Sequence, residues 1–258
     1  MEWAILLRCT SPVAEMPRRG PVQATLVVYE QCGSLSMSKH HLSISENGVG
    51  MYEPTDVVTT EAEVRQILGE GYASQVQKVI DHIDDHCRKW IERSPFIVVA
   101  SFDRLGMMDV SPKGDAAGFV RYLDPQSLAI PDRPGNRRGD TFFNILQMPR
   151  IGVLFIVPKR KEVLRVSGSA QIVRDRDLLN SMASKGRVPA LAVLLQVEEA
   201  MFHCGKSITR SGLWEPSAWG SVEGLPTYAQ ALIDHAKPPY TVDEMATRLA
   251  AHDKEFLY

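Results

Sequence analysis

The sequence predicts a mainly β protein of the α+β class, built as an antiparallel barrel with peripheral helices. Six or seven short apolar segments follow one another between residues 96 and 197, joined by tight turns and with few helices between them. Helices do not alternate with strands along the chain, which disfavours a parallel α/β sheet. The number of segments and their short connections together favour a closed antiparallel barrel.

Two helices are expected before the first strand. Thr60 and Glu63 have capping-box spacing and predict a short helix that ends at Leu68. Apolar residues recur every three or four positions over residues 76–90 and predict a second helix, which Pro95 ends. Two histidines lie four residues apart on this helix, but their neighbours are aspartates, so a solvated face is expected and no metal site.

The remaining elements follow from alternation, apolar runs and capping residues. The expected strands are residues 96–102, 107–111, 119–123, 127–130, 151–157, 163–173 and 190–197, and the expected helices are residues 140–147, 175–184, 227–236 and 241–256. Two regions result. Residues 1–45 form an N-terminal extension whose order the sequence leaves open, and residues 46–258 form the barrel domain with C-terminal helices at 226–257.

Composition excludes several classes of function. The 29 basic and 31 acidic residues leave a net charge of −2, so no general attraction to nucleic acid is expected. No apolar run reaches the ~18 residues that a membrane span requires. The 4 cysteines have no metal-binding spacing, which argues against a zinc site and favours reduced thiols in the cytoplasm.

The loop at residues 130–144 is the most informative segment of the chain. It places Arg133, Arg137 and Arg138, together with two glycines, between an apolar strand and a short helix. Arginine forks supply charge and paired donors, glycine lets the backbone approach a ligand, and the helix start adds free N–H groups. The loop therefore predicts a phosphate site; the alternative is a solvated turn with scattered charge.

Three segments in this order resemble the pyridoxamine-phosphate-oxidase-like flavoproteins: residues 111–114 (Ser-Pro-Lys-Gly), the arginine loop, and residues 205–214. The resemblance covers about residues 60–220 and is to a bacterial branch of that family, since the substrate-phosphate motif of the vitamin B6 enzyme is missing. It implies an FMN-binding split barrel, and a homodimer with both sites at the subunit interface.

The resemblance also implies which residues hold FMN. Arg137 and Arg138 match the basic residues that hold the phosphate in the family, and Ser111 and Lys113 stand where further phosphate and ring contacts are made. The full expected set is Met108, Asp109, Val110, Ser111, Lys113, Asn136, Arg137, Arg138, Asn144 and Trp214, with no metal ligand.

A second candidate segment lies after the last strand. Lys206 and Arg210 are four residues apart, with Trp214 a further four along, so all three are expected on one helical face. Two cations beside a large aromatic ring suit a flavin edge or an anionic substrate. Lys206 and Arg210 are therefore the candidate catalytic residues, stabilising negative charge. The alternative is a surface helix whose tryptophan docks into the core.

These features predict a cytoplasmic FMN-dependent oxidoreductase that acts on a small organic molecule, with NAD(P)H or O2 as its electron partner and no nucleic-acid or membrane partner. Two alternatives stay open. One is a barrel that stores or senses FMN or haem without turnover, with His203, His235 and His252 as weak candidates for a haem ligand. The other is an F420-dependent reductase, whose cofactor tail would lie along Arg133 and Arg165.

Overall fold

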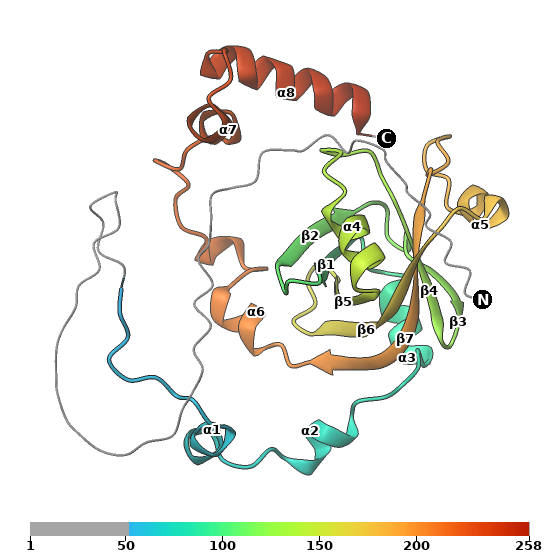
Figure 1. Ribbon diagram of the computed structural model, residues 1–258, viewed down its shortest axis with the longest axis vertical. Coiled ribbons are helices and arrows are strands. Elements are labelled where there is room, and N and C mark those ends of the chain that lie inside the picture. Colours follow the sequence, from blue (N-terminus) through green and yellow to red (C-terminus); the bar gives the residue numbers. More distant parts are fainter. Residues whose placement is uncertain (1–51, 258) are drawn as a thin grey trace, which may run out of the picture. The chain divides into compact units, whose positions relative to one another are not determined.

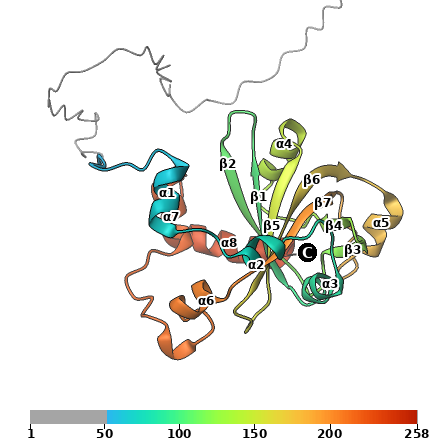
Figure 2. The same ribbon diagram turned by 90° about the horizontal axis from the view of Figure 1, so that it is seen from below.

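The computed structural model describes residues 52–257 (Figures 1 and 2). The chain divides into two units, Met1–Thr60 and Glu61–Tyr258. Of the first unit, the described residues 52–60 contain neither helix nor strand. The predicted N-terminal extension, residues 1–45, and its boundary with the barrel domain lie outside the described residues.

Seven strands form one antiparallel sheet in the order β2-β1-β5-β6-β7-β4-β3. The strands are β1 (Phe96–Phe102), β2 (Met108–Gly114), β3 (Arg121–Asp124), β4 (Ser127–Pro131), β5 (Arg150–Ile156), β6 (Val163–Val173) and β7 (Ala192–His203). Among the described residues no ladder joins the edge strands β2 and β3. The expectation of a closed barrel was therefore wrong, and the curled, open sheet is a split barrel.

Alternation along the strands places the hydrophobic core on one face of the sheet. Ile97 and Val99 of β1, and Val153 and Phe155 of β5, are almost completely buried, while their neighbours along each strand are more exposed. The Nε1 of Trp90 donates a hydrogen bond to the carbonyl oxygen of Phe155 at 3.2 Å, so the indole N–H has a partner where the ring packs against the core.

The long strands β6 and β7 are joined across a bulge. Ser167 pairs with Glu199 and Gly168 with Val197, so Glu198 is the extra residue. A Cβ on Gly168 would lie 1.9 Å from the carbonyl oxygen of Gln196, so the two strands can approach here only at a glycine. The predicted strand 163–173 has the bounds of β6.

The helices before the sheet differ in part from expectation. Helix α1 (Glu61–Leu68) is confirmed, but the single helix predicted over residues 76–90 is two helices, α2 (Ala73–Gln77) and α3 (Asp85–Ile91). The break occurs because Ile80 forms a β-bridge with Ala200, donating to and accepting from its backbone at 3.0 and 2.7 Å. The side chain of Asp84 then caps α3.

The later helices are α4 (Asp140–Gln147), α5 (Arg176–Ser181), α6 (Lys206–Ser211), the 3-10 turn η1 (Pro216–Ala218), α7 (Tyr228–Ala236) and α8 (Val242–Phe256). Helix α4 packs beside β1 and β6 (Figure 2), and α7 packs against α8. Thr241 and Glu244 form a capping box at the start of α8, the helix expected at residues 241–256. No helix between residues 52 and 257 is long and apolar enough to cross a membrane.

Candidate functional site

A cavity of about 1010 Å³ lies at the end of β2. Its walls are residues 109–114 of β2, the arginine loop and start of α4 at residues 131–142, the segment at residues 184–190, and the two α8 residues His252 and Phe256. This volume stands at the upper end of the range usual for small-molecule sites.

Pairing between β4 and β7 brings two of these walls together. Pro131, the last residue of β4, is opposite Ala192, the first residue of β7. Beyond the ladder, the backbone N–H of Asp132 donates to the carbonyl oxygen of Leu191 at 2.9 Å. The arginine loop leaves β4 where the 184–190 segment enters β7, so residues far apart in the sequence share one cavity.

The arginine loop is shaped by its own backbone and one side chain. Arg137 and Gly139 have left-handed backbone angles, with φ of 58° and 74°. The side-chain oxygen of Asn136 accepts a hydrogen bond from the backbone N–H of Arg138 at 3.0 Å, closing an Asx turn. Asn136 therefore orients the two arginines, and Gly139 ends the loop as the N-cap of α4.

The arginines of the loop differ in what their guanidinium groups contact. Arg138 forms an ion pair with Asp140 at 2.6 Å near the surface. Arg137 lines the cavity and forms no ion pair with any residue between 52 and 257. Arg137 is thus the guanidinium of this loop that is most available to an anionic ligand.

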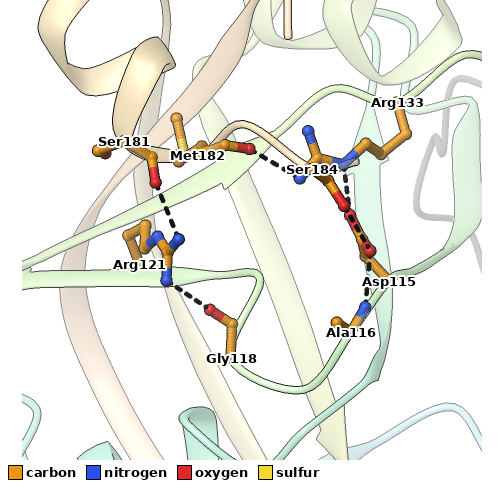
Figure 3. A network of polar contacts seen from close by, with 8 residues as sticks. All are labelled: Asp115, Ala116, Gly118, Arg121, Arg133, Ser181, Met182 and Ser184. Atoms are coloured by element: carbon orange, nitrogen blue, oxygen red, sulfur yellow. Dashed lines mark hydrogen bonds and ion pairs between the residues drawn. The ribbon is translucent and has the colours of Figure 1, made fainter. Parts of the chain in front are cut away.

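Arg133, the first arginine of the loop, lies in a polar network that ties three segments together (Figure 3). Its Nε donates to Asp115 at 2.6 Å, and its Nη2 donates to the carbonyl oxygen of Met182 at 2.9 Å. Ser184 also donates to Asp115, at 3.3 Å. The Asp115 side chain is only 2% exposed, so this ion pair is buried and joins the end of β2, the arginine loop and the turn after α5.

A lysine and an aspartate form the inner charged part of the cavity wall. Burial lowers the pKa of Lys113, against the opposing influence of Asp132 and Asp109. Burial likewise raises the pKa of Asp132, against the influence of Lys113 and Arg133. The Nζ of Lys113 reaches the hydroxyl of Ser111 at 3.4 Å. The pair offers one amine and one carboxyl group, each partly desolvated, to whatever occupies the cavity.

Most of the predicted cofactor-binding residues come together here. The cavity is lined by Asp109, Val110, Ser111, Lys113, Asn136, Arg137 and Arg138. Met108 is 63% exposed and does not line it. Asn144 is buried inside the fold, where its Nδ2 donates to the hydroxyl of Ser101 at 3.0 Å, so it connects α4 to β1 and does not line the cavity.

The cavity wall does not include the predicted residues Lys206, Arg210 and Trp214. Helix α6 ends at Ser211 before the left-handed Gly212, so Trp214 does not share a helical face with the two cations as expected. Its Nε1 donates instead to the carbonyl oxygen of Arg160, in the turn between β5 and β6, at 2.7 Å. Because β7 begins beside the cavity and runs twelve residues before α6, these side chains are absent from the cavity wall of their own chain.

The cavity wall also contains residues that were not predicted to bind a ligand, and Arg187, His252 and Phe256 are among them. Nothing in the spacing around Arg187 distinguishes it from the other basic residues. His252 was considered only as a weak haem ligand on a solvated helix. It is exposed, as expected, but it also lines the cavity, with its ring centroid 4.9 Å from that of Phe256.

The arginines proposed to hold the tail of F420 are both engaged within the fold. Arg133 is bound to Asp115, and Arg165 forms an ion pair with Glu199 across β6 and β7. Both guanidinium groups therefore already have a carboxylate partner, which weakens the case for a long anionic tail bound along them.

Residues 83–204 match the family model described as pyridoxamine 5'-phosphate oxidase. This segment contains the whole sheet and nearly all of the cavity wall, and it belongs to the pyridoxamine 5'-phosphate oxidase-like family. No curated protein sequence matches the chain.

Several solved structures have a similar arrangement of elements. HupZ of Group A Streptococcus is 18% identical over 46% of this chain and 93% of its own, with a TM-score of 0.39. HutZ, the heme storage protein of Vibrio cholerae, is 10% identical over 47% and 94%, with a TM-score of 0.36. An FMN-binding protein of Syntrophomonas wolfei is 9% identical over 55% and 95%, with a TM-score of 0.35.

Proposed function

We propose that the protein is an FMN-dependent oxidoreductase that acts on a small organic molecule. The observation that carries the proposal is the cationic cavity at the end of β2, formed by Arg137, Arg138, Lys113 and Ser111 within a segment of the pyridoxamine 5'-phosphate oxidase-like family.

The donors of this cavity suit the chemical parts of FMN. A phosphate dianion needs guanidinium and hydroxyl donors, which Arg137, Arg138 and Ser111 supply on two adjacent walls. Val110, Phe119 and Phe142 add apolar surface for a flat ring. When bound, FMN supplies hydride transfer, which no side chain of the cavity can supply.

The residues around such a ring would position the substrate and stabilise charge. Lys113 places an amine of lowered pKa in the wall, and Asp132 a carboxyl group of raised pKa. These shifts make the amine of Lys113 easier to deprotonate and the carboxylate of Asp132 easier to protonate than exposed lysine and aspartate side chains. Lys113 and Asp132 are better placed for acid–base work in this cavity than any residue of α6.

Lys206, Arg210 and Trp214 would contribute from a second subunit. In a homodimer, the segment after β7 of one protomer can reach the cavity of its partner, and Lys206 and Arg210 would there stabilise negative charge on the flavin or substrate. An apolar surface supports this assembly: Val110 on β2 is 62% exposed, and Phe143 and Leu146 on α4 are 58% and 74% exposed.

The first experiment is an absorbance spectrum of the purified protein, followed by denaturation and mass analysis of the released chromophore. Flavin bands and released FMN are expected. Oxidation of NADH or NADPH, with O2 or a small organic acceptor, then tests turnover, and light scattering tests the dimer. A colourless protein that takes up no added FMN would contradict the proposal.

A second candidate is haem binding without turnover, and one observation favours it. His252 lines the cavity and carries an imidazole that can ligate iron. A Soret band that is lost in His252→Ala, with no released FMN, would select this candidate over the flavoenzyme.

A further inference from the structure

The charges on the cavity wall do not all neutralise one another. Arg133 is paired with Asp115, and Arg138 with Asp140. Arg137 and Arg187 are the two arginines of the wall that form no ion pair with any residue between 52 and 257. The cavity thus presents two guanidinium groups to a ligand, from two different segments of the chain.

A rigid turn holds Arg187 at the cavity. Ser184 and Arg187 exchange backbone hydrogen bonds of 3.0 and 2.9 Å. Between them, Lys185 and Gly186 have φ angles of 46° and 78°, both in the left-handed region, as in the tight two-residue turns of hairpins. A turn of this kind has little freedom, so the backbone that carries Arg187 is well defined.

The buried network anchors this turn at its base. Asp115 accepts a hydrogen bond from the hydroxyl of Ser184, and Arg133 donates to the carbonyl oxygen of Met182 (Figure 3). Both contacts join the start of the turn to the end of β2 and to the arginine loop. Arg187 is therefore fixed relative to Arg137 by the same ion pair that orders the cavity walls.

The surroundings of Arg187 suit the organic part of a substrate. Val188, Pro189 and Ala190 follow it along the wall, and the rings of His252 and Phe256 belong to the same cavity. The volume, about 1010 Å³, is at the upper end for a single ligand. A cofactor whose phosphate is bound by the arginine loop would leave Arg187 unoccupied.

We propose that Arg187 binds a second anionic group, a phosphate or carboxylate carried by the substrate, while Arg137 and Arg138 hold the phosphate of the cofactor. The proposal rests on the proposed function and adds the substrate class, a small anionic organic molecule. A guanidinium in a ligand cavity without a carboxylate partner gains most from a charged acceptor, so neutral substrates should bind less well.

Two titrations test this assignment. Flavin fluorescence gives the FMN affinity of the wild type, Arg187→Ala and Arg137→Ala. Calorimetry then measures binding of inorganic phosphate, and separately of acetate, to each protein saturated with FMN. In Arg187→Ala the FMN Kd should stay within about threefold of wild type, while phosphate or acetate binding weakens by about tenfold or more. Arg137→Ala should show the opposite pattern: FMN affinity should fall, while phosphate or acetate binding stays close to that of the wild type.

Two further variants control for folding and for general charge. Arg187→Gln keeps a polar side chain of similar length and should lose the anion as Arg187→Ala does, which covers the case of an alanine variant that fails to fold. Arg104→Ala removes an exposed arginine from the turn between β1 and β2, outside the cavity wall, and should change neither titration.

The outcomes separate the two proposals. Equal losses of FMN affinity in the Arg187 and Arg137 variants would assign Arg187 to the cofactor phosphate and overturn the second anion site. Anion binding that is absent from the wild type, or unchanged in both Arg187 variants, would overturn it as well. If the wild type takes up no FMN, the proposed function fails, and the anion titration of the protein as purified still decides the role of Arg187.

Discussion

Arg133 and Asp115 form a buried ion pair, with 2.6 Å between Nε and Oδ2, and side chains that are 17% and 2% exposed. Arg133 belongs to the loop that sequence patterns assign to phosphate binding, yet its guanidinium is occupied by the protein itself. It binds Asp115 and the carbonyl oxygen of Met182 and so holds the walls of the cavity in place. The proposed ligand-binding arginines are therefore the two that follow it in the loop, together with Arg187.

Breaking this pair should destabilise the fold. Asp115→Asn leaves the guanidinium of Arg133 buried without a charged partner, and we expect the free energy of unfolding to fall by about 3–5 kcal/mol. Urea denaturation measures this. Glu92→Gln is the matched control. Glu92, at the end of α3, forms an exposed ion pair with Arg88, so its loss should leave the urea midpoint almost unchanged. Equal midpoints for both variants would contradict the structural role of the buried pair.

Removing both arginines that are proposed to hold the FMN phosphate should abolish FMN retention. Arg137→Ala combined with Arg138→Ala removes the phosphate donors, so the Kd for FMN should rise by at least about 100-fold. Riboflavin lacks the phosphate and should bind the variant and the wild type alike. A double variant that still purifies yellow would refute the placement of the phosphate at this loop.

The bulge between β6 and β7 should tolerate no side chain at residue 168. In Gly168→Ala the new Cβ meets the carbonyl oxygen of Gln196 at 1.9 Å, and separating the strands should cost about 3 kcal/mol or more. Gly152→Ala in β5 is the control, because its Cβ would have no atom within 4 Å. Thermal unfolding of the two variants should differ clearly; similar melting temperatures would show that the strands move apart easily.

The two cysteines of the described residues should differ in reactivity. Burial raises the pKa of the Cys87 thiol to about 12, whereas Cys204 is exposed. A raised pKa keeps Cys87 protonated at pH 8, and the thiol is a far weaker nucleophile than the thiolate. Iodoacetamide followed by peptide mass mapping should find Cys204 modified and Cys87 intact until the protein is unfolded in urea.

The same shift has a consequence at alkaline pH. Because the folded-state pKa of Cys87 lies above that of the unfolded thiol, the folded state holds its proton over a pH range in which the unfolded state has lost it. Its contribution to stability is therefore lost as pH rises from about 9 towards 12. Cys87→Ala should flatten this part of the pH dependence; an unchanged slope would exclude Cys87 as its cause.

Some elements were predictable because their signals are local. The alternation of residues 163–173 has the bounds of β6, and Thr241 with Glu244 caps α8 as their spacing predicts. The helix predicted over residues 76–90 was wrong because its helical spacing coexists with a bridge from Ile80 to Ala200, a residue 120 positions away. No local pattern records such a partner.

The features of the candidate site also fall into those that the sequence indicated and those that only the tertiary structure revealed. Sequence alone indicated the fold class and the family, and it singled out the loop around Arg137 as a candidate phosphate site, because strand alternation, turn residues and clustered arginines are all local properties. Only the tertiary structure decided that Arg133 binds Asp115, that Trp214 docks on the carbonyl oxygen of Arg160, and that Arg187 enters the cavity. Each depends on which distant segment lies opposite, and strand pairing sets that through contacts across the whole chain.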